Sequence, residues 1–134
     1  MRIKIKQIIA MIALFAGIAF GYSAKAQIPD EIILSLKSGN AKTLAKHFSS
    51  NVELTVLDRE DVYSKAQAEQ LVRNFFEKYS PDKFFLIHQG TQEGRPYAIG
   101  NLQSGRNTFR VSFLLRKGEG DYKIHMLRIE KVDE

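Results

Sequence analysis

Three side chains in this sequence are the main candidates for acid–base or hydrogen-bonding chemistry: His88, Tyr97 and Tyr63. An imidazole changes its charge near neutral pH, so a buried His88 would act as a general base or polarise a carbonyl group. A phenol beside it would donate a hydrogen bond to an oxygen that gains negative charge. One hypothesis is therefore a cofactor-free lyase or isomerase that uses a pocket His88 with Tyr97 or Tyr63.

Each candidate also has a purely structural interpretation. His88 shares strand parity with Phe84 and Leu86, but Phe85 and Ile87 compete equally for the buried face, so the face of His88 stays open. Tyrosines often bury the ring and leave the hydroxyl at the rim of a core. The sequence places no carboxylate beside His88, and we therefore assign no catalytic residue.

Other chemistries lack the residues that they need. The chain contains no cysteine, which excludes thiol nucleophiles, disulfides and cysteine-based zinc sites. His47 and His125 have no metal-ligand spacing with a carboxylate or a third histidine. The sequence shows no motif of a metalloprotease, a serine hydrolase, a phosphate-binding loop or an EF-hand. We expect neither a metal nor a cofactor.

Residues 1–26 have the pattern of a secretory signal peptide. Basic residues precede an apolar stretch, residues 8–20, that is shorter than the roughly 20 residues needed to span a bilayer. Ala24-Lys25-Ala26 then places small residues at a cleavage site before Gln27. We expect export to the periplasm or the medium, with no stable membrane span after cleavage. An uncleaved N-terminal anchor is the alternative.

The remaining chain, residues 27–134, is almost neutral and is expected to form one domain. The whole sequence has 20 Lys and Arg against 15 Asp and Glu, but four of the bases lie in the leader. Residues 27–134 therefore hold 16 bases and 15 acids. Nucleic-acid binding needs a concentrated basic face, so we expect no nucleic-acid partner.

Hydrophobic spacing predicts three helices in the first half of this domain. One is expected over residues 29–38, and Asn40 caps a short second helix whose apolar face includes Phe48. The clearest helix opens with a capping box formed by Ser64 and Gln67. Its apolar stripe consists of Ala68, Leu71, Val72, Phe75, Phe76 and Tyr79.

Period-two alternation predicts the strands. A strand over residues 52–56 is followed by a short return strand at residues 62–63. Short glycine-containing connections then favour an antiparallel meander. Its four main strands are residues 84–89, 97–103, 108–117 and 122–131. The expected class is α+β, with N-terminal helices packed on a curved antiparallel sheet of four main strands plus a short hairpin.

The last strand breaks its alternation at Leu127 and Ile129, which change parity relative to the residues before them. A bulge near Met126-Leu127 would return both to the core. Otherwise they form an outer apolar patch with Leu114, which would suit a homodimer through the sheet. The bulge is favoured, because without it Arg128 would face inward with no identifiable partner.

The order of these elements resembles the nuclear transport factor 2-like fold, also called cystatin-like. More narrowly, the chain resembles an uncharacterised domain-of-unknown-function family of small secreted bacterial proteins, typical of Bacteroidota. The stretches that carry the resemblance are Ser38-Gly39-Asn40-Ala41, Tyr63-Ser64-Lys65, Gln67-Ala68, Phe75-Phe76, His88-Gln89-Gly90, Tyr97-Ala98-Ile99-Gly100 and Phe109-Arg110-Val111. The resemblance implies a fold and an exported address but no established activity. The wider superfamily includes isomerases, dehydratases, epoxide hydrolases, ligand binders and dimerisation modules, and fold alone does not choose among them.

A curved sheet over a helix can leave a conical pocket for a mostly apolar ligand. Without an assignable catalytic set, we favour an exported non-catalytic domain that binds a small apolar ligand or a protein partner, including an envelope protein or a second copy. The alternative is the lyase or isomerase described above.

Overall fold

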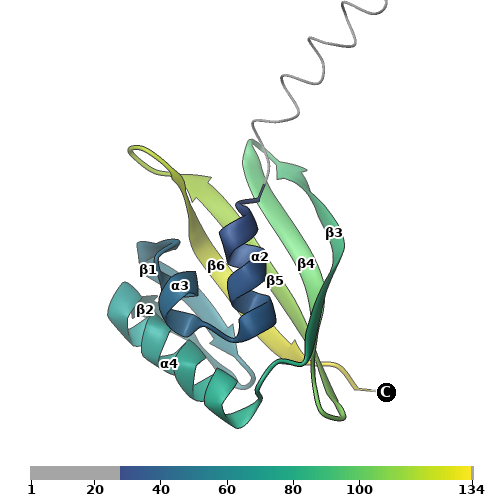
Figure 1. Cartoon of the computed structure of the whole chain (residues 1–134). Coiled ribbons are helices and arrows are strands. Elements are labelled where there is room, and N and C mark those ends of the chain that lie inside the picture. The colour runs from purple at the N-terminus through teal and green to yellow at the C-terminus, as the bar shows by residue number, and fades with distance from the viewer. Residues whose placement is uncertain (1–27, 134) are drawn as a thin grey trace, which may run out of the picture.

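The structure, a computed structural model, describes residues 28–133 (Figure 1). The signal peptide and the cleavage site before Gln27 that the sequence predicts lie outside the described residues. Within them, three helices and six strands follow one another in the order α2, α3, β1, β2, α4, β3, β4, β5, β6.

The first two helices begin and end at residues whose chemistry suits those positions. Helix α2 (Asp30–Ser38) carries two acids in its first turn and ends at Gly39, whose φ of 68° is the left-handed conformation that glycine adopts without strain. Helix α3 (Ala41–Ala45) is capped by Asn40, whose side-chain oxygen accepts from the Thr43 N–H at 3.0 Å. The predicted Asn40 cap is therefore confirmed, and α2 begins at Asp30, one residue after the predicted start.

Helix α4 (Lys65–Lys78) begins with the predicted capping box. The Ser64 hydroxyl accepts from the Gln67 N–H at 3.2 Å, and the Gln67 side chain reaches back to the Ser64 N–H. The predicted stripe faces the core: its buried members are Ala68, Val72, Phe75 and Phe76. No helix within residues 28–133 is long and apolar enough to cross a membrane.

The strands form one six-stranded mixed sheet in the order β2-β1-β6-β5-β4-β3. Their bounds are β1 Phe48–Val56, β2 Arg59–Ser64, β3 Lys83–Gln92, β4 Arg95–Ser104, β5 Asn107–Lys117 and β6 Tyr122–Lys131. The meander β3 to β6 is antiparallel, as predicted.

The prediction of four main strands plus a separate short hairpin is wrong in one respect. Strand β1 pairs in parallel with β6, with Leu54 beside Leu127, so the hairpin belongs to the main sheet. Strand β1 also begins earlier than expected, because Phe48 is buried at the start of the strand rather than on a helix face. Parallel pairing joins segments far apart in sequence, and local periodicity carries no signal for it.

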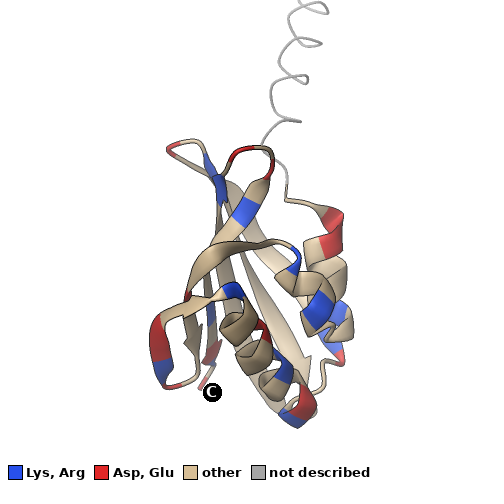
Figure 2. Ribbon diagram, turned by 90° about the vertical axis from the view of Figure 1, so that its left-hand side faces the viewer, with Lys and Arg blue, Asp and Glu red and all other residues tan. Residues whose placement is uncertain are grey.

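The helices cover one face of this sheet, and the core lies between the two layers (Figures 1 and 2). The inner faces of the central strands are fully buried under the helices. Their members include Ala98, Leu102, Phe109, Val111, Phe113, Leu115, Ile124, Leu127 and Ile129. No helix within residues 28–133 lies over the opposite face, and we call it the open face.

A β-bulge decides which residues of β6 reach the core. Leu115 pairs with Ile124 but Leu114 pairs with Met126, so His125 is the additional residue. The bulge brings Leu127 and Ile129 to the inner face. The predicted bulge is confirmed, one residue earlier than placed.

The alternative outer patch of Leu114, Leu127 and Ile129 is accordingly wrong. Leu127 and Ile129 are fully buried, at 0% exposure, beneath the helices. Leu114 alone keeps its predicted place on the opposite face, paired with Met126.

Candidate functional site

Aromatic side chains occupy the interior where the sequence predicts a conical pocket. The rings of Phe75 and Phe109 meet edge-on with centroids 4.9 Å apart, and the Tyr79 ring lies 4.8 Å from Phe109. Farther along the sheet, Phe84 lies so close over Gly100 that a Cβ there would be 2.5 Å from Phe84 Cζ. A filled interior of this kind gives little room for a ligand.

His88 does not point into this interior. Strand β3 contains a bulge at Ile87, because Leu86 pairs with Gly100 while His88 pairs with the very next residue, Ile99. The additional residue shifts His88 to the open face, where it is exposed. Of the two faces that the sequence left open for His88, the structure therefore shows the outer one, and the bulge is the physical reason.

The structure nevertheless brings His88 and Tyr97 together. Their Nε2 and hydroxyl oxygen are 2.9 Å apart, with ring centroids separated by 5.5 Å. Gly90 makes room for the phenol, since a Cβ at that position would be 3.0 Å from the Tyr97 hydroxyl. The pair lies on the open face in contact with solvent, without the desolvation that sharpens acid–base catalysis.

Tyr63 belongs to a different region. It pairs with the fully buried Val52 across the β1–β2 hairpin, which places it on the helix-covered face. There it borders a shallow depression of about 220 Å³ with Gln67, Gln70 and Leu71. The sheet therefore separates Tyr63 from the His88–Tyr97 pair, and the three candidates do not form one site.

The open face carries a continuous set of apolar side chains. Tyr97, Leu114 and Met126 are direct cross-strand neighbours on β4, β5 and β6. Ile99 lies beside Tyr97 on the same face of β4, and Phe85 extends the set onto β3, where it is 52% exposed. We call these five residues the open-face band.

The acids of β1 and β2 lie apart from most of the bases of this face, and β6 adds one further acid, Glu130. Glu53 and Glu60 project from β1 and β2, where they share the face of Met126. Arg95, Arg116 and Lys123 lie on β4, β5 and β6, on the side of the band away from Arg128. The open face is therefore apolar at its centre, with an acidic margin at β1 and β2 and a basic margin formed by Arg95, Arg116 and Lys123.

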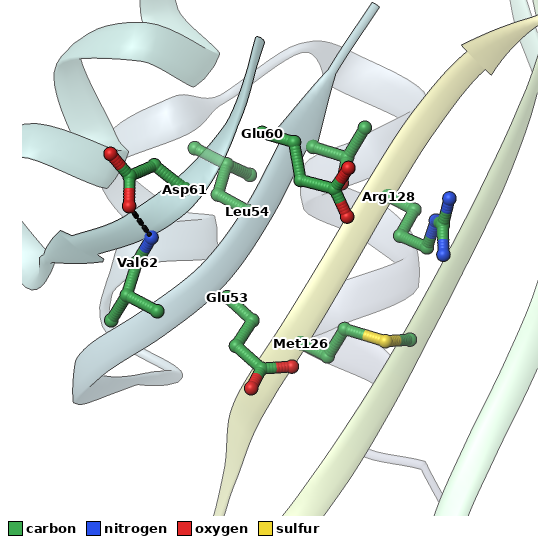
Figure 3. A pocket seen from close by; sticks show the side chains of 8 residues that line it. Glu53, Leu54, Glu60, Asp61, Val62, Met126 and Arg128 are labelled. Carbon is green, nitrogen blue, oxygen red and sulfur yellow. Dashed lines mark hydrogen bonds between the residues drawn. The ribbon is translucent and has the colours of Figure 1, made fainter.

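A groove of about 300 Å³ opens on this face where the β1–β2 hairpin meets β6. Its lining includes the side chains of Glu53, Glu60, Met126 and Arg128, which rise from the strands in Figure 3. Thr55 lies between Glu60 and Arg128 in the sheet and is only 7% exposed.

Asp61, which also lines this groove, directs a carboxylate oxygen to the Val62 N–H at 2.8 Å. Despite these carboxylates, the described residues contain no group of three His, Asp or Glu side chains suited to a metal ion.

Arg128 is the distinctive residue of the groove. Its Nε lies 3.3 Å from Glu130 Oε1, within ion-pair distance. The geometry is not that of a hydrogen bond, and within residues 28–133 this Nε is the buried side-chain polar atom without a hydrogen-bond partner. Such atoms are rare in folded proteins and call for a physical explanation.

Comparison with known proteins identifies the family. The model of a domain of unknown function, DUF4783, matches residues 29–130. This chain belongs to the DUF4783 family. The resemblance predicted from the sequence is thereby confirmed.

Solved structures of other DUF4783 proteins are similar throughout. One from Bacteroides ovatus is 31% identical, with 81% of this chain and 99% of that chain covered and a TM-score of 0.76. One from Bacteroides uniformis is also 31% identical, with 81% of this chain and 100% of that chain covered and a TM-score of 0.76.

More distant likeness shows the fold alone. A putative dehydratase from the nuclear transport factor 2-like family of Streptomyces avermitilis is 11% identical over 78% of this DUF4783 chain and 91% of its own, with a TM-score of 0.57. No functionally curated protein matches the chain.

Sequence reasoning did not find the groove. Alternation in residues 52–56 indicated that Glu53 and Thr55 share a face, but Arg128 reaches that face only through the parallel β1–β6 pair. The available signal was the change of parity in β6, which required a bulge and so placed Arg128 on the open face.

Proposed function

We propose that this DUF4783 domain is an exported, non-catalytic binding module that pairs with a second copy of itself through its open face. The observation that carries the proposal is the open-face band, which lies on the central strands of a sheet face that no helix of the described part of the chain covers. The exported address rests on the signal peptide that the sequence predicts.

The band supports association because antiparallel sheets with one solvated face normally present polar residues there. Here Tyr97, Leu114 and Met126 form an uninterrupted apolar row across three adjacent strands. Contiguous exposed apolar surface of this kind marks a contact site. The aromatic filling of the interior, by contrast, favours a protein partner over a small apolar ligand.

The charges favour a second copy as the partner. A two-fold axis that runs along the strands places β1–β2 of one copy over β3–β4 of the other. Glu53 then approaches the half of the partner that carries Arg95, and the same contact is repeated by symmetry. Both copies thereby bury their open-face bands, and the acidic margin of each copy faces the basic margin of the other.

The exposed position of His88 and Tyr97 supports the non-catalytic part of the proposal. A general base needs a closed site that excludes water and holds the substrate against it. On the open face, the hydrogen-bonded pair instead presents two rings tilted by 51° to each other, and tyrosine is among the residues enriched in protein contacts.

Light scattering on the mature chain, residues 27–134, tests self-association. We expect a dimer for the native sequence and a monomer for Leu114→Lys, because a charge would then lie within the apolar contact. Leu34→Lys is the matched control, since Leu34 is 60% exposed on α2, away from the open face, and this variant should remain a dimer.

A monomeric native chain at concentrations of about 100 μM, where even micromolar affinity gives mostly dimer, would contradict self-association. Equal dissociation by Leu34→Lys would contradict the assigned surface. Circular dichroism of each variant shows whether the fold is retained.

Export has a separate measurement. Mass spectrometry of the protein recovered outside the cytoplasm should give a chain that begins at Gln27. An intact Met1 in the membrane fraction would instead indicate an uncleaved anchor.

A further inference from the structure

The groove between β1, β2 and β6 places groups of opposite charge on either side of a buried threonine. Glu60 and Arg128 are the two cross-strand neighbours of Thr55, on β2 and β6 respectively. Two strand spacings, about 10 Å, therefore separate their backbones. Within residues 28–133, the guanidinium forms its ion pair along its own strand with Glu130 rather than across the groove with Glu60. The space between the opposite charges is open.

The unpartnered Nε–H of Arg128 indicates what should occupy one end of this space. A buried donor without an acceptor is destabilising, and a carboxylate oxygen is the acceptor that a guanidinium binds most strongly. Nε itself is buried, but the Arg128 side chain as a whole is 42% exposed, so a ligand oxygen can approach its exposed part from the groove.

The other end of the groove requires the opposite charge. The carboxylates of Glu53 and Glu60 repel a purely anionic ligand, whereas a purely cationic ligand leaves the Arg128 donor unpaired. A molecule with a carboxylate and an ammonium group on one short scaffold satisfies both ends.

The remaining walls are apolar and the groove is small. Val62 and Met126, the cross-strand neighbours of Glu53 on β2 and β6, line it beside the charged groups. Its volume of about 300 Å³ is at the lower limit of small-molecule sites. Methionine adapts its shape to aliphatic groups with little specificity. These walls suit an aliphatic side chain of moderate size.

We infer that this groove binds a free α-amino acid with an aliphatic side chain. The carboxylate of the amino acid accepts from Arg128, its ammonium group lies against Glu60 and Glu53, and its side chain contacts Met126. This inference goes beyond the proposed self-association. The groove shares Met126 with the open-face band and Glu53 with the proposed dimer contact, so leucine and a second copy compete for this surface.

An NMR titration of the isotope-labelled protein with L-leucine tests the inference. We expect the amide signals of Thr55, Glu60 and Arg128 to shift with increasing leucine, whereas those of the helices do not. Two half-ligands on the native protein separate the two charges: 4-methylpentanoate lacks the amine and 3-methylbutylamine lacks the carboxylate. Each should bind at least about tenfold more weakly than leucine, because one charged group of the groove is left unpaired.

Two matched variants assign the effect to one guanidinium. Arg128→Gln should weaken leucine binding by about tenfold or more, through loss of a charge-assisted hydrogen bond. Arg110→Gln should leave it unchanged, because Arg110 lies on the same face but its Nε already donates to Asn101 Oδ1 at 3.0 Å. The NMR spectrum of each variant also reports whether the variant is folded. If Arg128→Gln does not fold, the half-ligands on the native protein still test the inference.

Three results would overturn the inference. The first is the absence of shifts with leucine up to about 10 mM, a concentration at which even millimolar affinity nearly saturates the site. The others are equal binding of 4-methylpentanoate and equal weakening of leucine binding by Arg110→Gln. The same titration on Ile99→Lys, a substitution in the open-face band outside the groove lining, separates this inference from self-association. Because the proposed dimer covers Met126 and Glu53, the groove is judged on the monomeric variant. Leucine binding by monomeric Ile99→Lys supports the inference, and a monomer that shows no shifts with leucine overturns it whether or not the native chain is a dimer.

Discussion

Replacing Gly100 by alanine tests the close contact between β3 and β4. A Cβ at this position would lie 2.5 Å from Phe84 Cζ and 2.6 Å from the carbonyl oxygen of Phe85. The Phe84 ring has limited freedom to move because it is 3% exposed, and the carbonyl is part of the β3 backbone. The substitution therefore forces the edge strand away from its neighbour.

Two opposing effects determine the size of the change. Alanine in a strand is favoured over glycine by roughly 0.5–1 kcal/mol, because less backbone entropy is lost on folding. Overpacking a close contact costs about 1–3 kcal/mol. Since backbone is one of the clashing groups, we expect the overpacking to dominate and the free energy of unfolding to fall by roughly 1–2 kcal/mol. For a domain of this size that corresponds to a Tm lower by about 5–10 °C.

Thermal and urea denaturation followed by circular dichroism measure this loss. Gly120→Ala is the control, because a Cβ at Gly120 has no heavy atom within 4 Å, and its stability should stay within about 0.5 kcal/mol of the native protein. Combining Gly100→Ala with Phe84→Leu should show coupling between the two sites, since the shorter side chain removes the ring contact but not the carbonyl contact. A Gly100→Ala protein at least as stable as the native one would refute the argument.

Two further predictions concern the core and a helix start. Leu127→Ala should lower the free energy of unfolding by about 2–5 kcal/mol, because Leu127 is fully buried. Leu114→Ala in the monomeric state should lower it by less than about 1 kcal/mol. Equal losses in urea denaturation would contradict the assigned faces. Ser64→Ala should cost about 1 kcal/mol through loss of the α4 cap. Ser50→Ala, at an exposed serine of β1, is the control. An unchanged urea midpoint for Ser64→Ala would show that the capping box contributes nothing.

Local patterns in the sequence predicted most of the fold. The Ser64–Gln67 capping box, the Asn40 cap and the apolar stripe of α4 depend on residues within one or two helical turns of each other. The meander follows from alternation and short connections, which are also local. The parallel β1–β6 pair was missed because it joins residues more than half the chain apart. The local sequence of neither strand indicates which strand it pairs with.

The candidate site was harder to predict because single additional residues decide which way side chains face. One bulge, at Ile87, turned His88 to the open face, and another, at His125, returned Leu127 and Ile129 to the core. The second was foreseeable because it alone kept Arg128 out of the core. The first was not, since Phe85 and Ile87 suited the inner face as well as Phe84 and Leu86.

The central position of β6 has a consequence for how the chain is synthesised and folds. This strand joins β1 to β5, yet it is the last of the six to leave the ribosome. Until residues 122–131 are available, the β1–β2 hairpin and the β3–β5 ladder have no shared edge along which to close. We therefore expect the nascent polypeptide to stay loosely organised up to its C-terminal segment, and a stop codon before Tyr122 to leave two half-sheets with exposed strand edges prone to aggregation.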